Sequence, residues 1–333
     1  MIWLLGIAVA LPLAGLLFQA LGSRRDAKRC PAPGRLASGL HLDQQGTGKP
    51  TIVLEAGIAA SSVSWSLVRS ELARHTTVLS YDRAGYAWSP AAQTPRSMPN
   101  LISELHTMLQ ASATEGPYVM VGHSFGGLLL RHFATRYPSD VAALVLVDPL
   151  EPFESHPLTP QQAYRLEKGV MLSRRGATLA QLGVVRFALD LMMAGAYGIP
   201  KLLAKATSGR GSAVPNRLVG EIRKLPRETW PAVKSHWCQP DSFRTMAQYL
   251  ERLPEYCALP LDDAALRNLP LVVISAEQSS PDVVAAHQKT AALSNLGRHI
   301  IAPGSGHWVQ LDSPDVVLQA IAAITGLSLE VSR

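Results

Sequence analysis

Short apolar runs alternate with amphipathic segments along most of the chain. The runs are rich in valine, isoleucine and leucine, and they begin near residues 51, 76, 118, 141, 269 and 298. Apolar residues recur at helical spacing between or after these runs, in residues 61–74, 99–112, 125–137, 281–293 and 314–324. Strands that alternate with helices are typical of a mostly parallel sheet covered by helices. The pattern therefore predicts an α/β fold with a mostly parallel, doubly wound sheet.

The alternation stops between residues 151 and 268. This interval has a helical pattern with proline-rich breaks and contains no strong strand signal. A helical cap inserted after the sixth strand is the simplest explanation, because a lid over the edge of a sheet needs an apolar stripe at helical spacing. We expect a first core segment at residues 36–150, a cap or lid at 151–268 and a second core segment at 269–333.

The N-terminal segment, residues 2–22, contains no charged side chain and is about as long as a helix that crosses a bilayer. We expect residues 1–23 to form a single transmembrane anchor. A cleaved signal peptide is the alternative, although the start lacks a basic region. A basic cluster follows the span, so the positive-inside rule places the catalytic domain in the cytoplasm. Residues 24–35 are expected to be a linker.

Composition limits the classes of partner and cofactor that fit this chain. With 333 residues, 47% of them hydrophobic, the chain can bury one large core with an insertion. Part of the formal charge of +6 lies in the basic cluster beside the N-terminal segment, which favours a membrane partner over nucleic acid. The sequence has no zinc-finger spacing and no phosphate-binding loop, and neither a metal nor a cofactor is expected. Cys238 and Cys257 could pair, or all three cysteines could remain thiols.

The segment YVMVGHSFGGLLLRHF changes from a strand pattern to a helical pattern at Ser124. Gly122 and Gly126 flank this residue and complete G-x-S-x-G, the nucleophile elbow, in which a serine on a sharp strand-to-helix turn exposes its hydroxyl. The following helix directs its N-terminus at the same place, so the N–H of Phe125 is positioned to stabilise an oxyanion. We therefore predict that Ser124 is a nucleophile.

Four segments together resemble the α/β-hydrolase superfamily, in particular its serine esterases, lipases and peptidases. They are VLEAGIAASSVSW, YDRAGYAWS, VGHSFGG and GSGHWVQLDSPDVV. The resemblance covers the chain from about Thr51 to Ile324 and implies the α/β-hydrolase fold, with a triad in the chain order serine, acid, histidine. His307, on a glycine-rich loop before the last helix, matches the general base that takes the proton of Ser124.

The acid of the triad departs from the common pattern. Family members often carry it a few residues after the strand that reads LVVISA here, and Gln278 or Ser279 occupies that place. A neutral side chain cannot stabilise an imidazolium as a carboxylate does. We predict that Asp148 is the acid. It lies at the end of the ALVLV strand, where some haloalkane dehalogenase-like members have their acid. Glu277 and Asp282 remain alternatives.

The loop after TIVLE is the expected oxyanion loop. Gly57 permits a close approach of the backbone, and the N–H of Ile58 is expected to be the second donor beside that of Phe125. Glu55 occupies a place where the family often has histidine.

Other residues near the motifs are assigned to binding or to structure. Gly57, His123 and Trp308 are expected to contact the substrate, with His123 as packing or pocket wall rather than as a base. Asp82 and Arg83 are expected to form a structural ion pair beneath the elbow.

These features predict an enzyme, a membrane-anchored serine hydrolase that cleaves small-molecule carboxylic esters through an acyl-enzyme on Ser124. The anchor and the apolar cap favour hydrophobic or lipid-like esters. An amidase or aminopeptidase, and an acyltransferase or haloperoxidase, are alternatives with the same Ser–His pair. A degenerate protein that only binds a partner is the third alternative.

Overall fold

The computed structural model describes residues 2–152, 158–196 and 223–329. The chain divides into two compact units. One consists of Met1–Ala32, Gly85–Ala87 and Thr159–Glu251, and the other of Pro33–Ala84, Trp88–Leu158 and Arg252–Arg333. We call them the helical unit and the sheet unit. The expected cap contributes to both, because its last residues, from Arg252, lie in the sheet unit.

An eight-stranded sheet forms the centre of the sheet unit, with strand order β1-β2-β4-β3-β5-β6-β7-β8. The first two strands are antiparallel to their neighbours, and all other neighbouring strands are parallel. The strands are β1 (Arg35–Ala37), β2 (Leu40–Gln45), β3 (Ile52–Glu55), β4 (Val78–Asp82), β5 (Tyr118–His123), β6 (Val141–Val147), β7 (Leu271–Ala276) and β8 (Gly297–Ala302).

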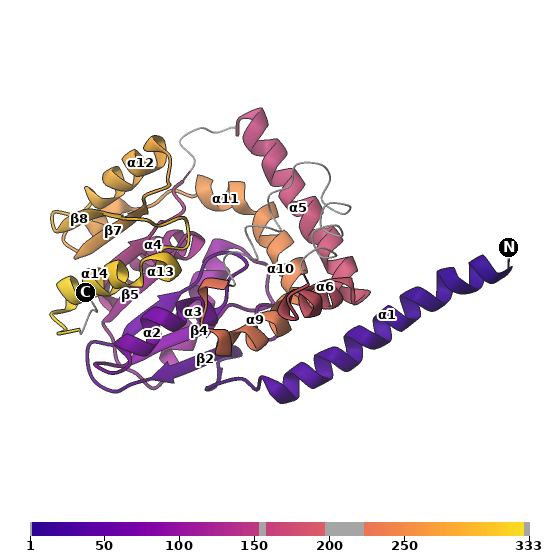
Figure 1. Cartoon of the computed structure of the whole chain (residues 1–333). Coiled ribbons are helices and arrows are strands. Elements are labelled where there is room, and N and C mark those ends of the chain that lie inside the picture. Colours follow the sequence, from indigo (N-terminus) through magenta and orange to yellow (C-terminus); the bar gives the residue numbers. More distant parts are fainter. Residues whose placement is uncertain (1, 153–157, 197–222, 330–333) are drawn as a thin grey trace. The chain divides into compact units, whose positions relative to one another are not determined.

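Helices cover both faces of the sheet (Figure 1). Those of the sheet unit are η1 (Ser62–Trp65), α2 (Ser66–Leu72), α3 (Met98–Gln110), α4 (Phe125–Arg136), η2 (Pro138–Asp140), α11 (Leu253–Ala258), η4 (Asp263–Leu266), α12 (Pro281–Ala291), α13 (Val309–Asp312) and α14 (Pro314–Thr325). Helices α2 and α14 pack against each other on one face. Helices α4 and α12 pack on the strands from the other. The predicted doubly wound α/β fold is confirmed.

The apolar runs of the sequence form the core strands because both faces of these strands are buried. Ile52, Leu54 and Ile274 point into the layer formed with α2 and α14. Adjacent residues of a strand point to opposite faces, so Ser275 faces α12 instead, where it contacts His287. Parallel strands end at the same edge of the sheet, which brings the loops after β3, β5, β6 and β7 together.

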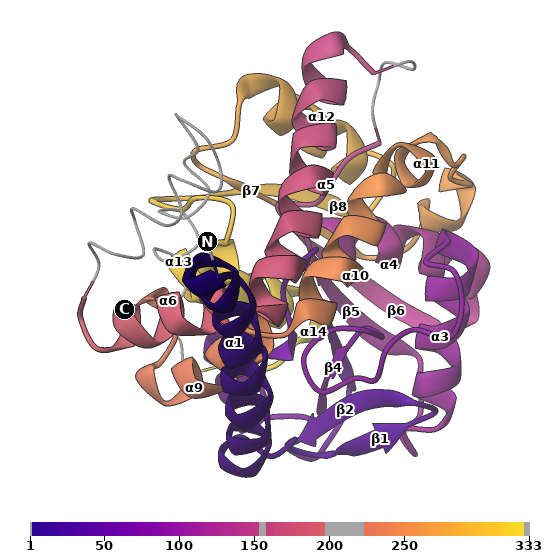
Figure 2. The same ribbon diagram turned by 90° about the vertical axis from the view of Figure 1, so that its right-hand side faces the viewer.

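The helical unit contains α1 (Ile2–Arg29), α5 (Pro160–Gln181), α6 (Val184–Met193), η3 (Arg227–Thr229), α9 (Trp230–Trp237) and α10 (Pro240–Glu251). Helices α5 and α10 run side by side (Figure 2). A capping box of Thr159 and Gln162 starts α5. Helices α5, α6, α9 and α10 lie within the interval of the expected cap, and residues 153–157 and 197–222 of that interval lie outside the described part.

The expectation of a membrane anchor is wrong. Within the part of the chain that the structure describes, no single helix has both the length and the apolar composition of a membrane span. Two consecutive helices, α5 and α6, have this length and composition only when taken together, and the chain bends by 83° between them. The expectations of an N-terminal single-pass anchor and of a catalytic domain placed by it are therefore contradicted, as is membrane attachment through α1.

Polar contacts of α1 account for the wrong expectation of a membrane anchor. Gln19 is 6% exposed and donates to the carbonyl oxygen of Cys238 at 2.8 Å, while Arg186 of α6 donates to the Gln19 side chain at 2.9 Å. Arg186, 1% exposed, also pairs with Asp26. These buried polar groups are satisfied by protein partners, as buried charges require. Helix α1 extends to Arg29, so it also includes the first residues of the expected linker.

The three cysteines are thiols in the structure. Of the two alternatives for Cys238 and Cys257, a bond between them is therefore absent and the thiols are present. Burial raises the pKa of the Cys238 thiol to about 12.

Candidate active site

Ser124 lies in the sharp turn between β5 and α4. Its backbone has φ 54° and ψ −122°, a conformation that a non-glycine residue rarely adopts. A Cβ at Gly122 would lie 2.7 Å from the carbonyl oxygen of Gly126, and a Cβ at Gly126 would lie 2.7 Å from that of Glu55. Both positions therefore require glycine. Strain of this kind is maintained by the surrounding structure and is frequent at functional sites.

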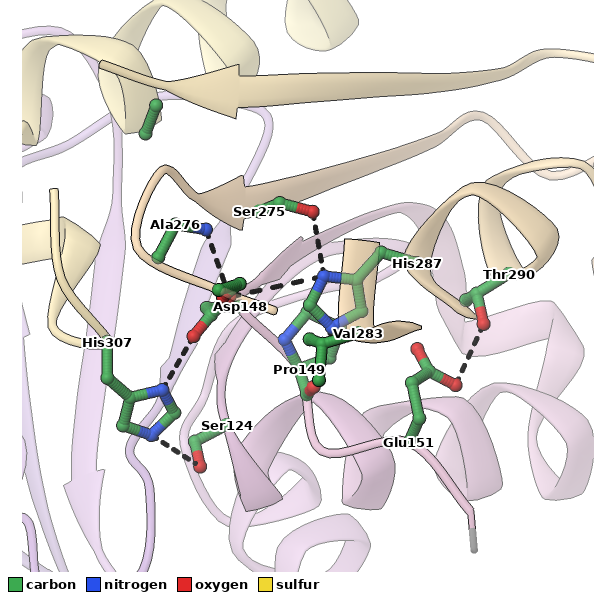
Figure 3. A network of polar contacts seen from close by, with 12 residues as sticks. Ser124, Asp148, Pro149, Glu151, Ser275, Ala276, Val283, His287, Thr290 and His307 are labelled. Carbon is green, nitrogen blue, oxygen red and sulfur yellow. Dashed lines mark hydrogen bonds and ion pairs between the residues drawn. The ribbon is translucent and has the colours of Figure 1, made fainter. Parts of the chain in front are cut away.

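His307 and Asp148 form a hydrogen-bonded chain with Ser124 (Figure 3). His307 Nε2 is 3.1 Å from Ser124 Oγ, and His307 Nδ1 is 2.6 Å from Asp148 Oδ2. Since a carboxylate only accepts, Nδ1 carries the proton and Nε2 of the neutral ring can accept one from the serine. This is the geometry of a nucleophile, a general base and an orienting acid.

Asp148 follows β6 directly, between the ends of β5 and β7. Its Oδ1 accepts hydrogen bonds from the N–H of Ala276 at 3.0 Å and the hydroxyl of Ser279 at 2.9 Å. Burial raises the pKa of Asp148, but the hydrogen bonds from His307, Ala276 and Ser279 outweigh it, and the pKa lies below its ordinary value. Asp148 is therefore an ionised acceptor at neutral pH.

The two alternative acids lie elsewhere. Glu277 accepts a hydrogen bond at 2.7 Å from the N–H of Gly304 in the histidine loop, and Asp282 lies exposed in the first turn of α12. Ser279 stands where the sequence pattern places an acid, and it donates to Asp148 instead. That role was missed, and a hydroxyl at the usual acid position is the signal that could have indicated it.

The loop after β3 approaches the nucleophile closely. A Cβ at Gly57 would lie 3.3 Å from Ser124 Cβ and 3.1 Å from Nδ1 of His123. Ile58 follows in this loop, and Phe125 is the first residue of α4. The first N–H groups of a helix have no carbonyl partner within the helix and attract negative charge. The predicted donors, the N–H groups of Ile58 and Phe125, thus belong to two segments that meet at Ser124.

Arg83 holds the carbonyl groups of the oxyanion loop. Its guanidinium donates to the oxygens of Ala56 and Gly57, each at 2.6 Å, and pairs with Glu55. The prediction of an ion pair between Asp82 and Arg83 needs correction, because Asp82 binds His41 at 2.7 Å and accepts from the N–H of Ser62. Sequence adjacency misled here, since neighbouring residues of a strand end point to opposite sides.

Glu55 is 1% exposed and accepts hydrogen bonds from Tyr81 and Arg83. Burial raises the pKa of Glu55 to about 7, although the charge of Arg83 acts in the opposite direction. The acid therefore changes its charge near neutral pH, directly before the oxyanion loop.

Stability is expected to fall as the pH rises from about 5 to about 7 because of Glu55. In this range the folded protein keeps a proton that the unfolded chain, with an ordinary pKa of 4.5, has released. We expect a loss of roughly 1 kcal/mol of unfolding free energy per pH unit, absent from Glu55→Gln. Urea unfolding of both proteins across this range measures it.

The matched control is Glu115→Gln, which removes a carboxylate whose side chain is 82% exposed and pairs with the exposed Lys49. It should follow the pH dependence of the native protein. A difference between the native protein and Glu55→Gln that stays constant with pH would contradict the prediction.

His123 and Trp308 support the histidine loop. His123 is 1% exposed, and its Nε2 donates to the carbonyl oxygen of His307 at 2.7 Å. Burial lowers the pKa of His123 to about 3, so the ring is neutral and cannot serve as an acid near neutral pH. The ring of Trp308 lies 5.3 Å from that of His123 and is partly exposed. His123 thus ties the nucleophile turn to His307, and Trp308 is the more accessible of the two.

The protein-family model described as alpha/beta hydrolase fold matches residues 50–314, which is more than half of the chain. The chain belongs to the α/β-hydrolase family. The first curated relatives of this α/β hydrolase align with about a third of it, and the alignments cover between 30% and 42% of the relatives' own length. Among the described residues of this chain, no cluster of three His, Cys, Asp or Glu side chains could hold a metal ion.

Lipase LipV of Mycobacterium tuberculosis is 35% identical over 111 residues, which are 33% of this α/β hydrolase and 41% of the lipase. The 2-(acetamidomethylene)succinate hydrolase of Mesorhizobium japonicum is 24% identical over 282 residues, 85% of this chain and 90% of that protein. A thermophilic esterase from Thermogutta terrifontis has a similar structure, with a TM-score of 0.57 at 18% identity over 85% of this chain and 92% of the esterase. This structural likeness shows the fold.

Proposed function

We propose that this α/β hydrolase is a serine hydrolase that cleaves small-molecule carboxylic esters. The observation that carries the proposal is the continuous chain from Asp148 through His307 to Ser124, with donor–acceptor distances of 2.6 and 3.1 Å. A buried and ionised acid, a histidine of fixed tautomer and a serine in a strained turn are what an acyl-enzyme mechanism requires.

In the first half-reaction, Ser124 Oγ attacks the ester carbonyl carbon while His307 Nε2 takes the hydroxyl proton. The N–H groups of Ile58 and Phe125 stabilise the oxyanion. The carbon–oxygen bond to the alcohol then breaks, and His307 returns its proton to the leaving alkoxide. In the second half-reaction, a water oxygen attacks the acyl carbon while His307 Nε2 takes a proton from the water. The bond between the acyl carbon and Ser124 Oγ then breaks, His307 returns the proton to Oγ, and the carboxylic acid leaves.

Esters with apolar acyl groups are the preferred substrates in this proposal. Ile58 and Trp308 are apolar residues beside the reacting groups, and each is partly exposed. The expected membrane anchor was one argument for lipid-like esters, and this argument no longer holds because the anchor is contradicted. An amide is the second substrate class that the same groups could cleave, and one relative is named 2-(acetamidomethylene)succinate hydrolase.

The test combines labelling with turnover. A fluorophosphonate should modify the native protein, and peptide mapping should place the adduct on Ser124. p-Nitrophenyl esters of increasing acyl length should be cleaved faster than the matched p-nitroanilides. Folded protein that is labelled elsewhere, or not at all, would contradict the nucleophile, and faster cleavage of the anilides would contradict the ester class.

A further inference from the structure

His287 lies on α12, outside the chain of Ser124, His307 and Asp148, and is completely buried (Figure 3). Its Nε2 is 2.9 Å from the carbonyl oxygen of Pro149, and its Nδ1 is 2.8 Å from Ser275 Oγ. Since a carbonyl oxygen can only accept, Nε2 must carry a proton whichever charge state the ring has. His287 is therefore a fixed donor to the residue that follows the proposed acid.

The segment that receives this hydrogen bond is strained. Asp148 has φ 41°, in the left-handed region, and it precedes a proline, which further restricts its backbone. A non-glycine residue remains in such a conformation only when surrounding contacts hold it there. Because the side chain is attached at Cα, a change of this φ angle would change the direction of the Asp148 carboxylate relative to His307.

Three hydrogen bonds from other segments hold the backbone of the turn. The N–H of Asp148 donates to the carbonyl oxygen of Ile274 at 2.7 Å, and the N–H of Leu150 donates to that of Ser124 at 2.9 Å. Between these backbone bonds, the carbonyl group of Pro149 is held by the His287 side chain. Pro149 has no N–H, so its peptide cannot be held through a donor of its own.

Ser275 and His299 fix the orientation of the His287 ring. Ser275 Oγ lies between His287 Nδ1, at 2.8 Å, and His299 Nε2, at 2.7 Å. The Nδ1 atom is also 4.0 Å from Asp148 Oδ1. These contacts leave the ring one orientation, in which Nε2 points at Pro149.

We propose that His287 is a positioning residue, whose hydrogen bond to the Pro149 carbonyl keeps the strained Asp148 turn in the conformation that directs its carboxylate at His307. The inference rests on the proposed roles of Asp148 and His307. It assigns no chemical step to His287, which acts only through the turn.

Two amide variants distinguish an effect of this hydrogen bond from an effect of side-chain packing. The amide nitrogen of glutamine can take the place of Nε2, so His287→Gln keeps a donor to Pro149. The shorter asparagine reaches only the place of Nδ1, so His287→Asn keeps a polar contact to Ser275 and loses the one to Pro149. Both variants bury an uncharged amide in the same site.

We expect His287→Asn to lower kcat about 100-fold with an unchanged KM, since a displacement of about 1 Å at reacting groups can cost that factor. His287→Gln should stay within about 3-fold of the native kcat, because it keeps the hydrogen bond. Thermal unfolding of both variants verifies that they fold. Equal kcat values for the two folded variants would overturn the proposal.

A second readout does not depend on turnover. The proton on His307 Nδ1, held between nitrogen and carboxylate at 2.6 Å, should give a far-downfield NMR resonance that Asp148→Asn removes. It should remain in His287→Gln and shift or broaden in His287→Asn. An unchanged resonance in His287→Asn would overturn the positioning role, whereas a native protein that cleaves no ester would overturn only the proposed function.

Discussion

Replacement of Ser124 by alanine is expected to lower ester turnover by about a million-fold, because the nucleophile of a serine hydrolase cannot be replaced by the base or the acid alone. The change removes only the hydroxyl that lies 3.1 Å from His307 Nε2. KM should change little. Steady-state hydrolysis of a p-nitrophenyl ester by highly purified protein measures the effect.

Ser70→Ala is the matched control for this prediction. Ser70 lies on the exposed side of α2, and its hydroxyl donates to carbonyl groups of its own helix, those of Ser66 and Leu67. We expect native turnover from this variant. Turnover by Ser124→Ala within about 10-fold of the native rate would show that another group attacks the ester, since loss of a nucleophile costs far more.

Asp148→Asn should lower kcat by about ten thousand-fold. The change keeps the size of the side chain but replaces an ionised acceptor by an amide. An amide NH₂ facing His307 Nδ1 donates a hydrogen bond, so the imidazole must carry its proton on Nε2 and can no longer accept the proton of Ser124. Comparison of kcat for the two proteins on one ester measures the loss.

Glu277→Gln tests whether Glu277, rather than Asp148, is the acid. Its amide oxygen can still accept the hydrogen bond from Gly304, so the histidine loop should keep its shape. We expect kcat within about 3-fold of the native value, because no bond of the proposed triad is lost. A larger loss in Glu277→Gln than in Asp148→Asn would assign the acid to Glu277 and contradict the geometry on which our proposal rests.

The local pattern predicted the central elements well. The expected helix at 99–112 is α3, Met98–Gln110, and the expected helix at 125–137 is α4, Phe125–Arg136. Strands buried on both faces produce continuous apolar runs, and helices with one buried face produce periodic ones, so both can be recognised within about ten to fifteen residues. The place of Ser124 in a strand-to-helix turn follows from the same local signal.

The local pattern failed where an element is short or where its environment lies elsewhere in the chain. Strand β1 has only three residues, and four of the six residues of β2, LHLDQQ, are polar, so neither strand has an apolar run that stands out. Residues 2–22 contain no charged side chain, and this local feature led to the wrong expectation of a membrane span. The hydrogen-bond partners of the buried Gln19 in this segment include Arg186 and Cys238, which are far away in the sequence.

By itself, the sequence determined the α/β fold, the turn that carries Ser124 and the loop that carries His307, because each depends on residues that are close neighbours. Only the tertiary structure decided which carboxylate meets His307. Asp148 lies 159 residues away, and the parallel register of β5, β6 and β7 brings its strand end between the neighbouring loops. Glu277 and Ser279 are closer in sequence, yet the fold directs the first at Gly304 and the second at Asp148 itself. Contacts of this kind depend on the packing of distant segments, which no local pattern records.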